Sequence, residues 1–236
     1  MELFFQCVFV VSVIALVISF FIDEPINMDR IHKNLKELDV KPLKKGQMSK
    51  YKLTITDSKG KRIVYPLDQD AFYFTIAHLS PNCEAFIDYM LELWCLTPFN
   101  LVLTTSLGEN NKTETLGLWK WNGSQHTISI CTHEMEREVM ALVLIHEIAH
   151  LQIHNLMNYS YVYNLAGKRI KSRYYGMNLK AHGPQFASVF AELSRPTLDM
   201  KKLYTPRQRR HLIEYFQSPK KVHLTPLTKG GQIPVY

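Results

Sequence analysis

The feature that most constrains the fold of this chain is an apolar segment at residues 141–153 that contains three polar, metal-compatible side chains. The segment reads ALVLIHEIAHLQI, and it lies within a stretch from His133 to Asn155 that has no Gly or Pro and many good helix formers. The sequence therefore predicts one long helix there. Apolar residues flank His146, Glu147 and His150 closely, as expected of a helix at the centre of a domain.

The spacing of these three residues predicts a metal site. Residues four apart lie on one face of a helix, about one turn from each other, so both imidazoles can point at one ion. Glu147 lies beside the first histidine, in the HExxH arrangement, where its carboxylate can activate a water. The alternative is a surface helix that carries these residues by chance. The apolar flanks favour the metal site, because burying such a triplet costs free energy unless something pairs with it.

A catalytic zinc site normally has three protein ligands and one water. No Asp or Glu occurs between Glu147 and Glu192, so a nearby downstream carboxylate ligand is not available. The HExxHxxGxxH pattern is absent, and His154 lies two turns from His146, too far along the axis to share the ion. His182 remains as the candidate, in the segment His-Gly-Pro-Gln-Phe at 182–186, where Gly183 permits a sharp turn and Pro184 suits the start of a helix.

The N-terminus raises the question of a membrane. Residues 3–22 are almost wholly apolar and long enough to span a bilayer as a helix. A secretory signal peptide is the rival interpretation, but the start is acidic at Glu2 and Ser19 to Ile22 is a poor cleavage site. We therefore expect an uncleaved anchor. A chain that started at Met28 would lack it and would be soluble.

Charge sets the expected orientation and part of the domain plan. No Lys or Arg precedes the apolar run, whereas several follow it, so the positive-inside tendency predicts a single-pass membrane protein with its catalytic domain in the cytoplasm. Three glycosylation-type triplets, at Asn111, Asn122 and Asn158, would matter only in a lumenal domain. The expected plan is an anchor at 1–22, a polar basic connector at 23–50 with a short helix at 28–38, a main domain at 51–217 and a flexible tail at 218–236.

Strand and helix signals alternate along the main domain. Two β-rich runs, at 51–56 and 62–67, flank turn-type residues and predict a hairpin. Further helices are expected at 69–79, from Ser80 onwards, after Gly183 and after Thr205, and short strands at 99–105, 115–122 and 126–131. Residues 156–181 look like an irregular insertion. The fold class expected is α+β, with a small sheet packed on the HExxH helix.

These residues resemble the SprT-like zincins, which carry HExxH on one helix and a third histidine in an H-G-P-x-F segment that opens the next helix. Here the two motifs are HEIAH at 146–150 and HGPQF at 182–186. A group of small predicted metallohydrolases from actinobacteria and their phages is similar. The resemblance covers roughly residues 80–195. It implies a zincin-like metallopeptidase fold, one catalytic Zn²⁺ held by His146, His150 and His182, Glu147 as general base, and a protein or peptide substrate.

Several functional alternatives stay open. The formal net charge of +7 and the basic clusters after residue 167 fit a protease that acts on DNA-bound proteins, as the Spartan branch of that family does. The membrane segment and the lack of a Cys-rich zinc ribbon make nucleic acid the less favoured partner. A non-catalytic binding module stabilised by zinc is a second alternative, and basic faces lying on anionic lipid are a third. The sequence contains no indication of the oligomeric state.

Overall fold

The computed structural model describes residues 26–198, except residue 58, residues 80–83, residue 108, residues 111–112, residues 133–136 and residues 165–166. The expected membrane anchor at 1–22, the last helix expected after Thr205 and the tail at 218–236 lie outside the described residues. So does Ser80, the expected start of the second helix.

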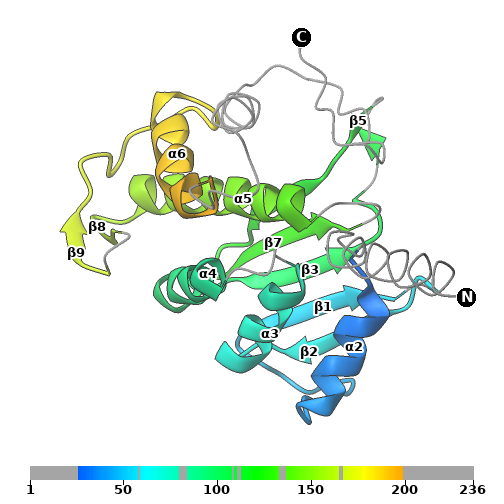
Figure 1. The fold of residues 1–236 in the computed structure, drawn as a ribbon. Coiled ribbons are helices and arrows are strands. Elements are labelled where there is room, and N and C mark those ends of the chain that lie inside the picture. Colours follow the sequence, from blue (N-terminus) through cyan, green and yellow to red (C-terminus); the bar gives the residue numbers. More distant parts are fainter. Residues whose placement is uncertain are drawn as a thin grey trace, which may run out of the picture.

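A five-stranded mixed sheet forms the centre of the domain, in the order β2-β1-β3-β7-β6 (Figure 1). The three inner strands run parallel to one another, and the two edge strands are antiparallel to their neighbours. The strands are β1 (Lys52–Thr56), β2 (Arg62–Pro66), β3 (Asn100–Thr104), β6 (Gly117–Trp121) and β7 (His126–Cys131). The expected α+β class with a small sheet is therefore confirmed.

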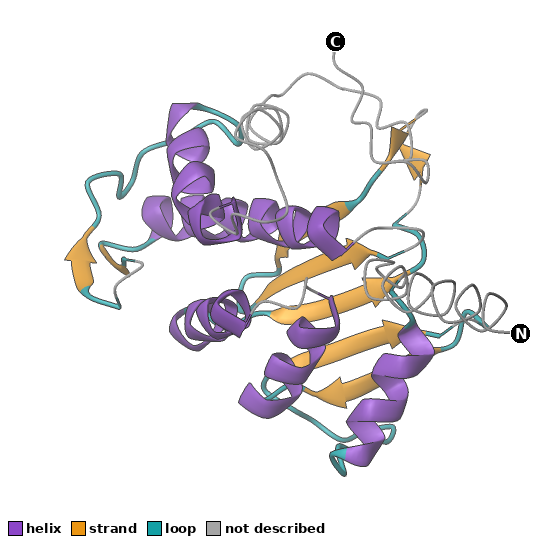
Figure 2. Ribbon diagram, in the orientation of Figure 1, coloured by secondary structure: helices purple, strands orange, loops and turns teal. Residues whose placement is uncertain are grey.

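Five helices are described: α2 (Met28–Glu37), α3 (Gln69–Leu79), α4 (Glu84–Leu96), α5 (Arg137–Asn158) and α6 (Pro184–Leu198). Figure 2 shows α2, α3 and α4 lying side by side in front of the sheet, with α5 crossing beside β7 and β6. Two small antiparallel pairs complete the fold: β4 (Glu109–Asn110) with β5 (Thr113–Glu114), and β8 (Tyr161–Tyr163) with β9 (Arg169–Lys171).

The strand register brings apolar side chains into rows on the face that the helices cover. One row runs across all five strands and joins Tyr65, Leu53, Leu101, Ile128 and Trp119. The next row is Ile63, Ile55, Leu103, Ile130 and Gly117. Because side chains alternate between the faces of a strand, these rows point into the core, and their inner members are completely buried. Each row ends at edge strand β6, beside α5.

The range expected to be a polar connector, 23–50, contains a helix that packs into the core. The short helix expected there is present as α2, but its apolar residues Met28, Ile31 and Leu35 are buried in the same core as the sheet. Asn27 caps the helix by accepting hydrogen bonds from two backbone amides of its first turn. Residues from Met28 onwards therefore belong to the main domain.

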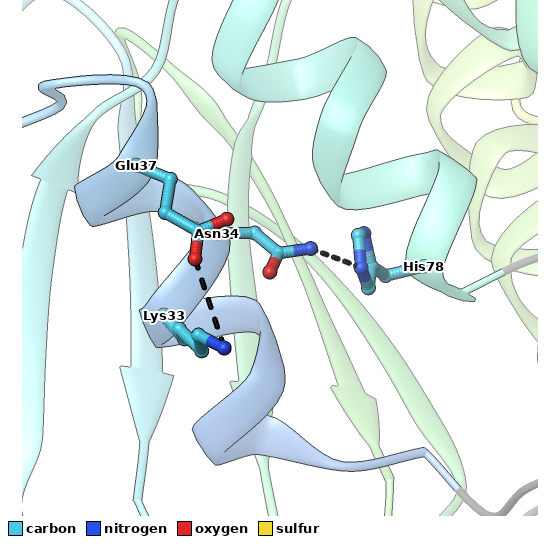
Figure 3. A network of polar contacts seen from close by, with 4 residues as sticks. All are labelled: Lys33, Asn34, Glu37 and His78. Atoms are coloured by element: carbon cyan, nitrogen blue, oxygen red, sulfur yellow. Dashed lines mark hydrogen bonds and ion pairs between the residues drawn. The ribbon is translucent and has the colours of Figure 1, made fainter.

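A polar contact fastens α2 to α3 (Figure 3). His78 donates from Nδ1 to the carbonyl of Phe74, 2.9 Å away, which leaves its Nε2 to accept from the Asn34 amide. Lys33 and Glu37, one turn apart on α2, form an exposed ion pair at 3.7 Å. The Asn34–His78 hydrogen bond joins two helices. The Lys33–Glu37 ion pair lies on the exposed surface of α2 alone, and such surface pairs contribute little to stability.

Helix α5 lies at the centre of the packing. Residues 139–158 of α5 are the one stretch of the described chain long and apolar enough to cross a membrane, but most of that stretch is buried inside the domain. Its apolar side chains contact β6, β7, α3 and α6. The hydrophobicity of α5 is therefore explained by its place in the core.

Candidate metal centre

Three histidines, two on α5 and one in the turn before α6, meet at one point. His146 and His150 project from the same face of α5, and His182 lies two residues before α6. The Nε2 atom of His146 lies 3.2 Å from Nε2 of His150 and 3.3 Å from Nε2 of His182. One ligand nitrogen from each ring lies within 4.8 Å of the other two. The structure thus brings together the three residues predicted as ligands.

This arrangement fits a divalent metal such as zinc. Zn–N bonds of about 2.0–2.1 Å at a tetrahedral ion place neighbouring ligand atoms about 3.3–3.4 Å apart. The two spacings from His146 are close to that value. Three imidazole Nε2 atoms that face one another need a cation or protons between them, and imidazole nitrogen is a ligand that zinc prefers.

The local structure explains how His182 reaches α5. The backbone amide of Gly183 donates to the carbonyl of Lys180, 3.1 Å away, and closes a tight turn around His182. Pro184 then begins α6, where its missing amide hydrogen costs nothing. A Cβ atom on Gly183 would lie 3.2 Å from the Lys180 Cβ, so the turn has little room for a side chain.

Phe186 holds the three rings in place. It is fully buried in the first turn of α6, and its ring centroid lies 4.9 Å from that of His146, 4.5 Å from that of His150 and 4.9 Å from that of His182. Phe190, one turn further along α6, stacks against Phe186 and also contacts His146. The aromatic wall therefore fixes the orientation of the ligands and excludes water from one side of them.

The protonation of the histidines suits metal binding. Burial, together with the nearby His182, lowers the pKa of His150 to about 4. Burial also lowers the pKa of His182. Both rings are consequently neutral at pH 7, and a neutral imidazole has the lone pair that a metal needs.

Glu147 lies beside the triad against edge strand β6. Its side chain is 6% exposed, and burial raises its pKa to about 8, opposed by a hydrogen bond that the backbone amide of Trp119 donates to the carboxylate. Gly117 makes this close approach possible. A Cβ atom there would lie 2.7 Å from both the Glu147 Oε1 and the Val143 Cγ1 atoms, which is closer than such atoms can approach. The glycine is a part of the site that the sequence motif did not reveal.

His154 is not a fourth ligand, as expected from its place on the helix. Its ring contacts those of Trp119, Trp121 and His126, at centroid separations of 5.2 to 5.3 Å. The Trp119 indole donates to Nδ1 of His126 at 3.3 Å. This histidine–tryptophan cluster joins α5 to β6 and β7, and sequence reasoning missed it, because its members come from three separate elements.

Strand β7 lies between β3 and β6, so β6 is the edge strand on that side of the described sheet. Two tyrosines of the stretch after α5, Tyr161 and Tyr163, line a separate pocket, and the ring of Tyr174 lies under Arg173. The aromatic neighbours that the structure gives the triad are Phe186 and Phe190.

Comparison with known proteins finds no match for this chain among family models, curated proteins or solved structures.

Proposed function

We propose that this chain is a zinc-dependent metallopeptidase, with His146, His150 and His182 as metal ligands and Glu147 as general base. The observation that carries the proposal is the convergence of three imidazoles, those of His146, His150 and His182, beside the buried side chain of Glu147. Three protein nitrogens leave one position open for water or substrate, the composition typical of a catalytic rather than a structural zinc site.

The chemistry divides between the ion and the protein. Zinc, when bound, supplies a water of lowered pKa, near ~7, and polarises the substrate carbonyl. Burial raises the pKa of Glu147 to about 8, but the positive charge of a bound divalent ion would lower it again and favour the ionised carboxylate. The carboxylate of Glu147 would then accept the proton of the attacking water and return it to the leaving amine. The amide of Trp119 holds the carboxylate in place, and Gly117 leaves it room. Phe186 and Phe190 keep water from the rear of the ligands.

The edge of the sheet offers a place for an extended substrate. Strand β6 runs beside α5, and its outer edge has no neighbouring strand in the described sheet. A peptide that pairs with β6 as an additional strand would pass Glu147. This supports a peptide bond, rather than a small ester, as the group that is cleaved.

Two alternative functions can be distinguished from the proposed metallopeptidase by experiment. A zinc-stabilised binding module would hold metal without hydrolysis, and Glu147→Gln would leave its function unchanged. A protease acting on DNA-bound proteins would share the metal site and differ in its partner. For localisation, we propose that the chain is membrane-anchored through residues 1–22, which a membrane fractionation of the full-length protein tests directly.

The deciding experiment measures metal content and hydrolysis in the same preparations. Full-length protein, purified in mild detergent with zinc and without chelators, is compared with His182→Ala and Glu147→Gln by elemental mass spectrometry. We expect about one zinc per chain in the parent and in Glu147→Gln, and a sharp reduction in His182→Ala. Hydrolysis of a fluorescently quenched casein substrate is expected from the parent and from neither His182→Ala nor Glu147→Gln.

His154→Gln is the matched control, because His154 lies on the same helix but outside the triad. It is expected to retain zinc and hydrolysis. Full zinc in His182→Ala would remove His182 from the site. Zinc without hydrolysis in the parent would favour the binding module, and no metal in any variant would exclude the hydrolase.

A further inference from the structure

A pocket lies on the other side of α5 from the three histidines. It has a volume of about 280 Å³ and is lined by aromatic rings, including Tyr51, Trp121, Tyr161 and Tyr163. Gln152 and Asn155 contribute the α5 wall. At 100° per residue, these two positions are about half a turn around the helix from His150 and His146. The pocket is therefore separate from the candidate metal centre.

The lining of this pocket combines flat apolar faces with neutral polar groups. Among the described residues that line it, none is Lys, Arg, Asp or Glu. Nδ1 of His126 accepts from the Trp119 indole, so the neutral imidazole carries its proton on Nε2. Gln152 and Ser124 add an amide and a hydroxyl. Such a pocket suits a planar ring that stacks on aromatic side chains and forms hydrogen bonds through its edge.

Cations lie beside the aromatic wall, on the β8–β9 ribbon. Tyr161 pairs with Lys171 and Tyr163 with Arg169, so these four side chains share one face of the ribbon. The Arg169 guanidinium lies 4.5 Å from the centroid of the Tyr161 ring. Tyr161 and Tyr163 are about half exposed, at 51% and 50%. No acidic residue occurs from residue 148 to residue 191, whereas five basic residues do: Lys168, Arg169, Lys171, Arg173 and Lys180.

We propose that this pocket binds a nucleotide unit, with the base among the tyrosines and Trp121 and the phosphate at Arg169 and Lys171. Base stacking on aromatic rings and a cationic border are the two elements of single-strand recognition. A neutral sugar would not need the cations, an acidic peptide would not need the aromatic pocket, and a lipid headgroup would not need the neutral polar lining. The unit can come from a free nucleotide or from a single-stranded nucleic acid, since both present the same base and phosphate.

The test measures binding directly, so it does not depend on hydrolysis or on bound metal. The anisotropy of a fluorescein-labelled oligothymidylate is followed as full-length protein in mild detergent is added at low salt. We expect saturable binding by the parent protein. Tyr161→Ala is expected to weaken the affinity about tenfold, which is within the range for loss of one stacking contact, whereas Tyr161→Phe is expected to retain the affinity. Arg169→Gln is expected to weaken binding and to reduce the slope of log K against log salt by about 1.

Arg62→Gln is the matched control, because it removes the same charge from an exposed position on β2. It is expected to change affinity by less than about twofold, if the pocket and not the overall positive charge holds the ligand. Circular dichroism checks that each variant is folded. Displacement of the probe by free thymidine monophosphate would identify a free nucleotide as the source, and retention of the probe would identify a single strand.

Three outcomes would overturn the proposal. The first is no binding of the oligonucleotide. The second is an equal loss in Arg62→Gln and Arg169→Gln, which would show unspecific attraction to a basic protein. The third is displacement of the probe by phosphatidylserine vesicles as effective as displacement by unlabelled oligonucleotide, with no change in the affinity of Tyr161→Ala for the probe. That result would show that the protein contacts anionic surfaces in general.

Discussion

Contacts of single atoms determine the position of the Glu147 carboxylate, the proposed general base. Glu147 is held by one backbone amide of β6 and has room only because residue 117 has no side chain. The metal ligands do not depend on that strand, since they contact one another and α6. At this scale, binding of metal and activation of water are therefore separable properties.

Gly117→Ala tests this separation. The added methyl group would meet the Glu147 Oε1 and Val143 Cγ1 atoms at 2.7 Å, so the carboxylate must move. A displacement of about 1 Å at a catalytic group costs up to about 100-fold in rate, and we expect a loss of roughly 10- to 100-fold in casein hydrolysis. Zinc content is expected to stay near one per chain. Loss of zinc together with activity would show that the strand supports the ligands as well.

From the pKa of His126 we predict that the protein loses stability in acid. Its pKa is lowered from 6.5 to about 4, mainly by burial, then by His154 on α5, and this is partly opposed by Asn155. The unfolded chain therefore binds a proton between pH 6.5 and about 4 that the folded chain does not, and stability falls as the pH decreases through that range. His154, the titratable neighbour in the cluster, is shifted in the same direction by burial.

The measurement compares melting temperatures from pH 7 to pH 4 for the parent and for His126→Asn, which keeps an acceptor for the Trp119 indole but does not titrate. The variant is expected to have the shallower decline over this range. Identical declines in the two proteins would show that other groups determine the acid sensitivity.

At the scale of the secondary-structure elements, the packing of α6 against α5 determines the geometry of the three-histidine site. This helix packs along α5, and its first turn carries the phenylalanine that touches all three imidazoles. A shift of α6 would move His182 and the aromatic wall together, so the geometry of the metal centre depends on helix packing as well as on the motif on α5.

Phe186→Ala is expected to reduce both stability and metal affinity. Removing a fully buried phenylalanine costs about 3–5 kcal/mol, and the cavity lies against the ligands. Urea unfolding and zinc release to a chromogenic chelator measure the two effects. Phe74→Ala is the control, because Phe74 is 37% exposed on α3. Zinc held equally well by Phe186→Ala would contradict a positioning role for this ring.

Local patterns in the sequence predicted most of these elements. The turn at 57–61 contains Asp57, whose carboxylate accepts from the amides of Lys59 and Lys61, and Gly60, which has a φ of 77°. The hairpin expected there is confirmed as β1 and β2. Helices expected at 69–79 and after Gly183 are α3 and α6. His146 and His150 followed from helical spacing alone, and His182 followed from the shortage of other ligands.

What the sequence did not reveal depends on contacts between distant residues. Strand order is one example, because the pairing of β7 with β3 and β6 is set by packing and not by any local signal. The β8–β9 ribbon is another. Residues 156–181 were expected to be irregular, because β8 and β9 are only three residues each and the stretch has many tyrosines and basic residues. The pocket beside it could not be predicted, because its walls come from five separate parts of the chain.

On the scale of the whole molecule, the described helices and the five-stranded sheet, from Met28 to α6, share one hydrophobic core. The described helices pack against one another and against one face of the sheet, and α2, which lies far from the metal centre in Figure 1, contributes Ile31 and Leu35 to that core. The folded unit is consequently larger than the sequence motifs suggested, and its N-terminal helix supports the sheet that β6 belongs to.

Leu35→Ala tests this larger unit. Leu35 is 1% exposed, so its truncation should cost about 2–5 kcal/mol of unfolding free energy in a single cooperative transition. Lys33→Ala, two residues away, removes only an exposed ion pair and should change stability by no more than about 1 kcal/mol. Equal stabilities of Leu35→Ala and the parent in urea would show that α2 is a connector and not part of the cooperative folding unit.

The distance along the chain between the second and third histidines has a consequence for protein engineering. The stretch from His150 to His182 leaves the core at the end of α5, forms the ribbon and returns through the turn at Gly183. Closing a flexible loop costs only about 0.6 kcal/mol more for each doubling of its length. We therefore expect the stretch that follows α5 to accept ribbons of other length and composition, so that new recognition could be added without rebuilding the three-histidine site.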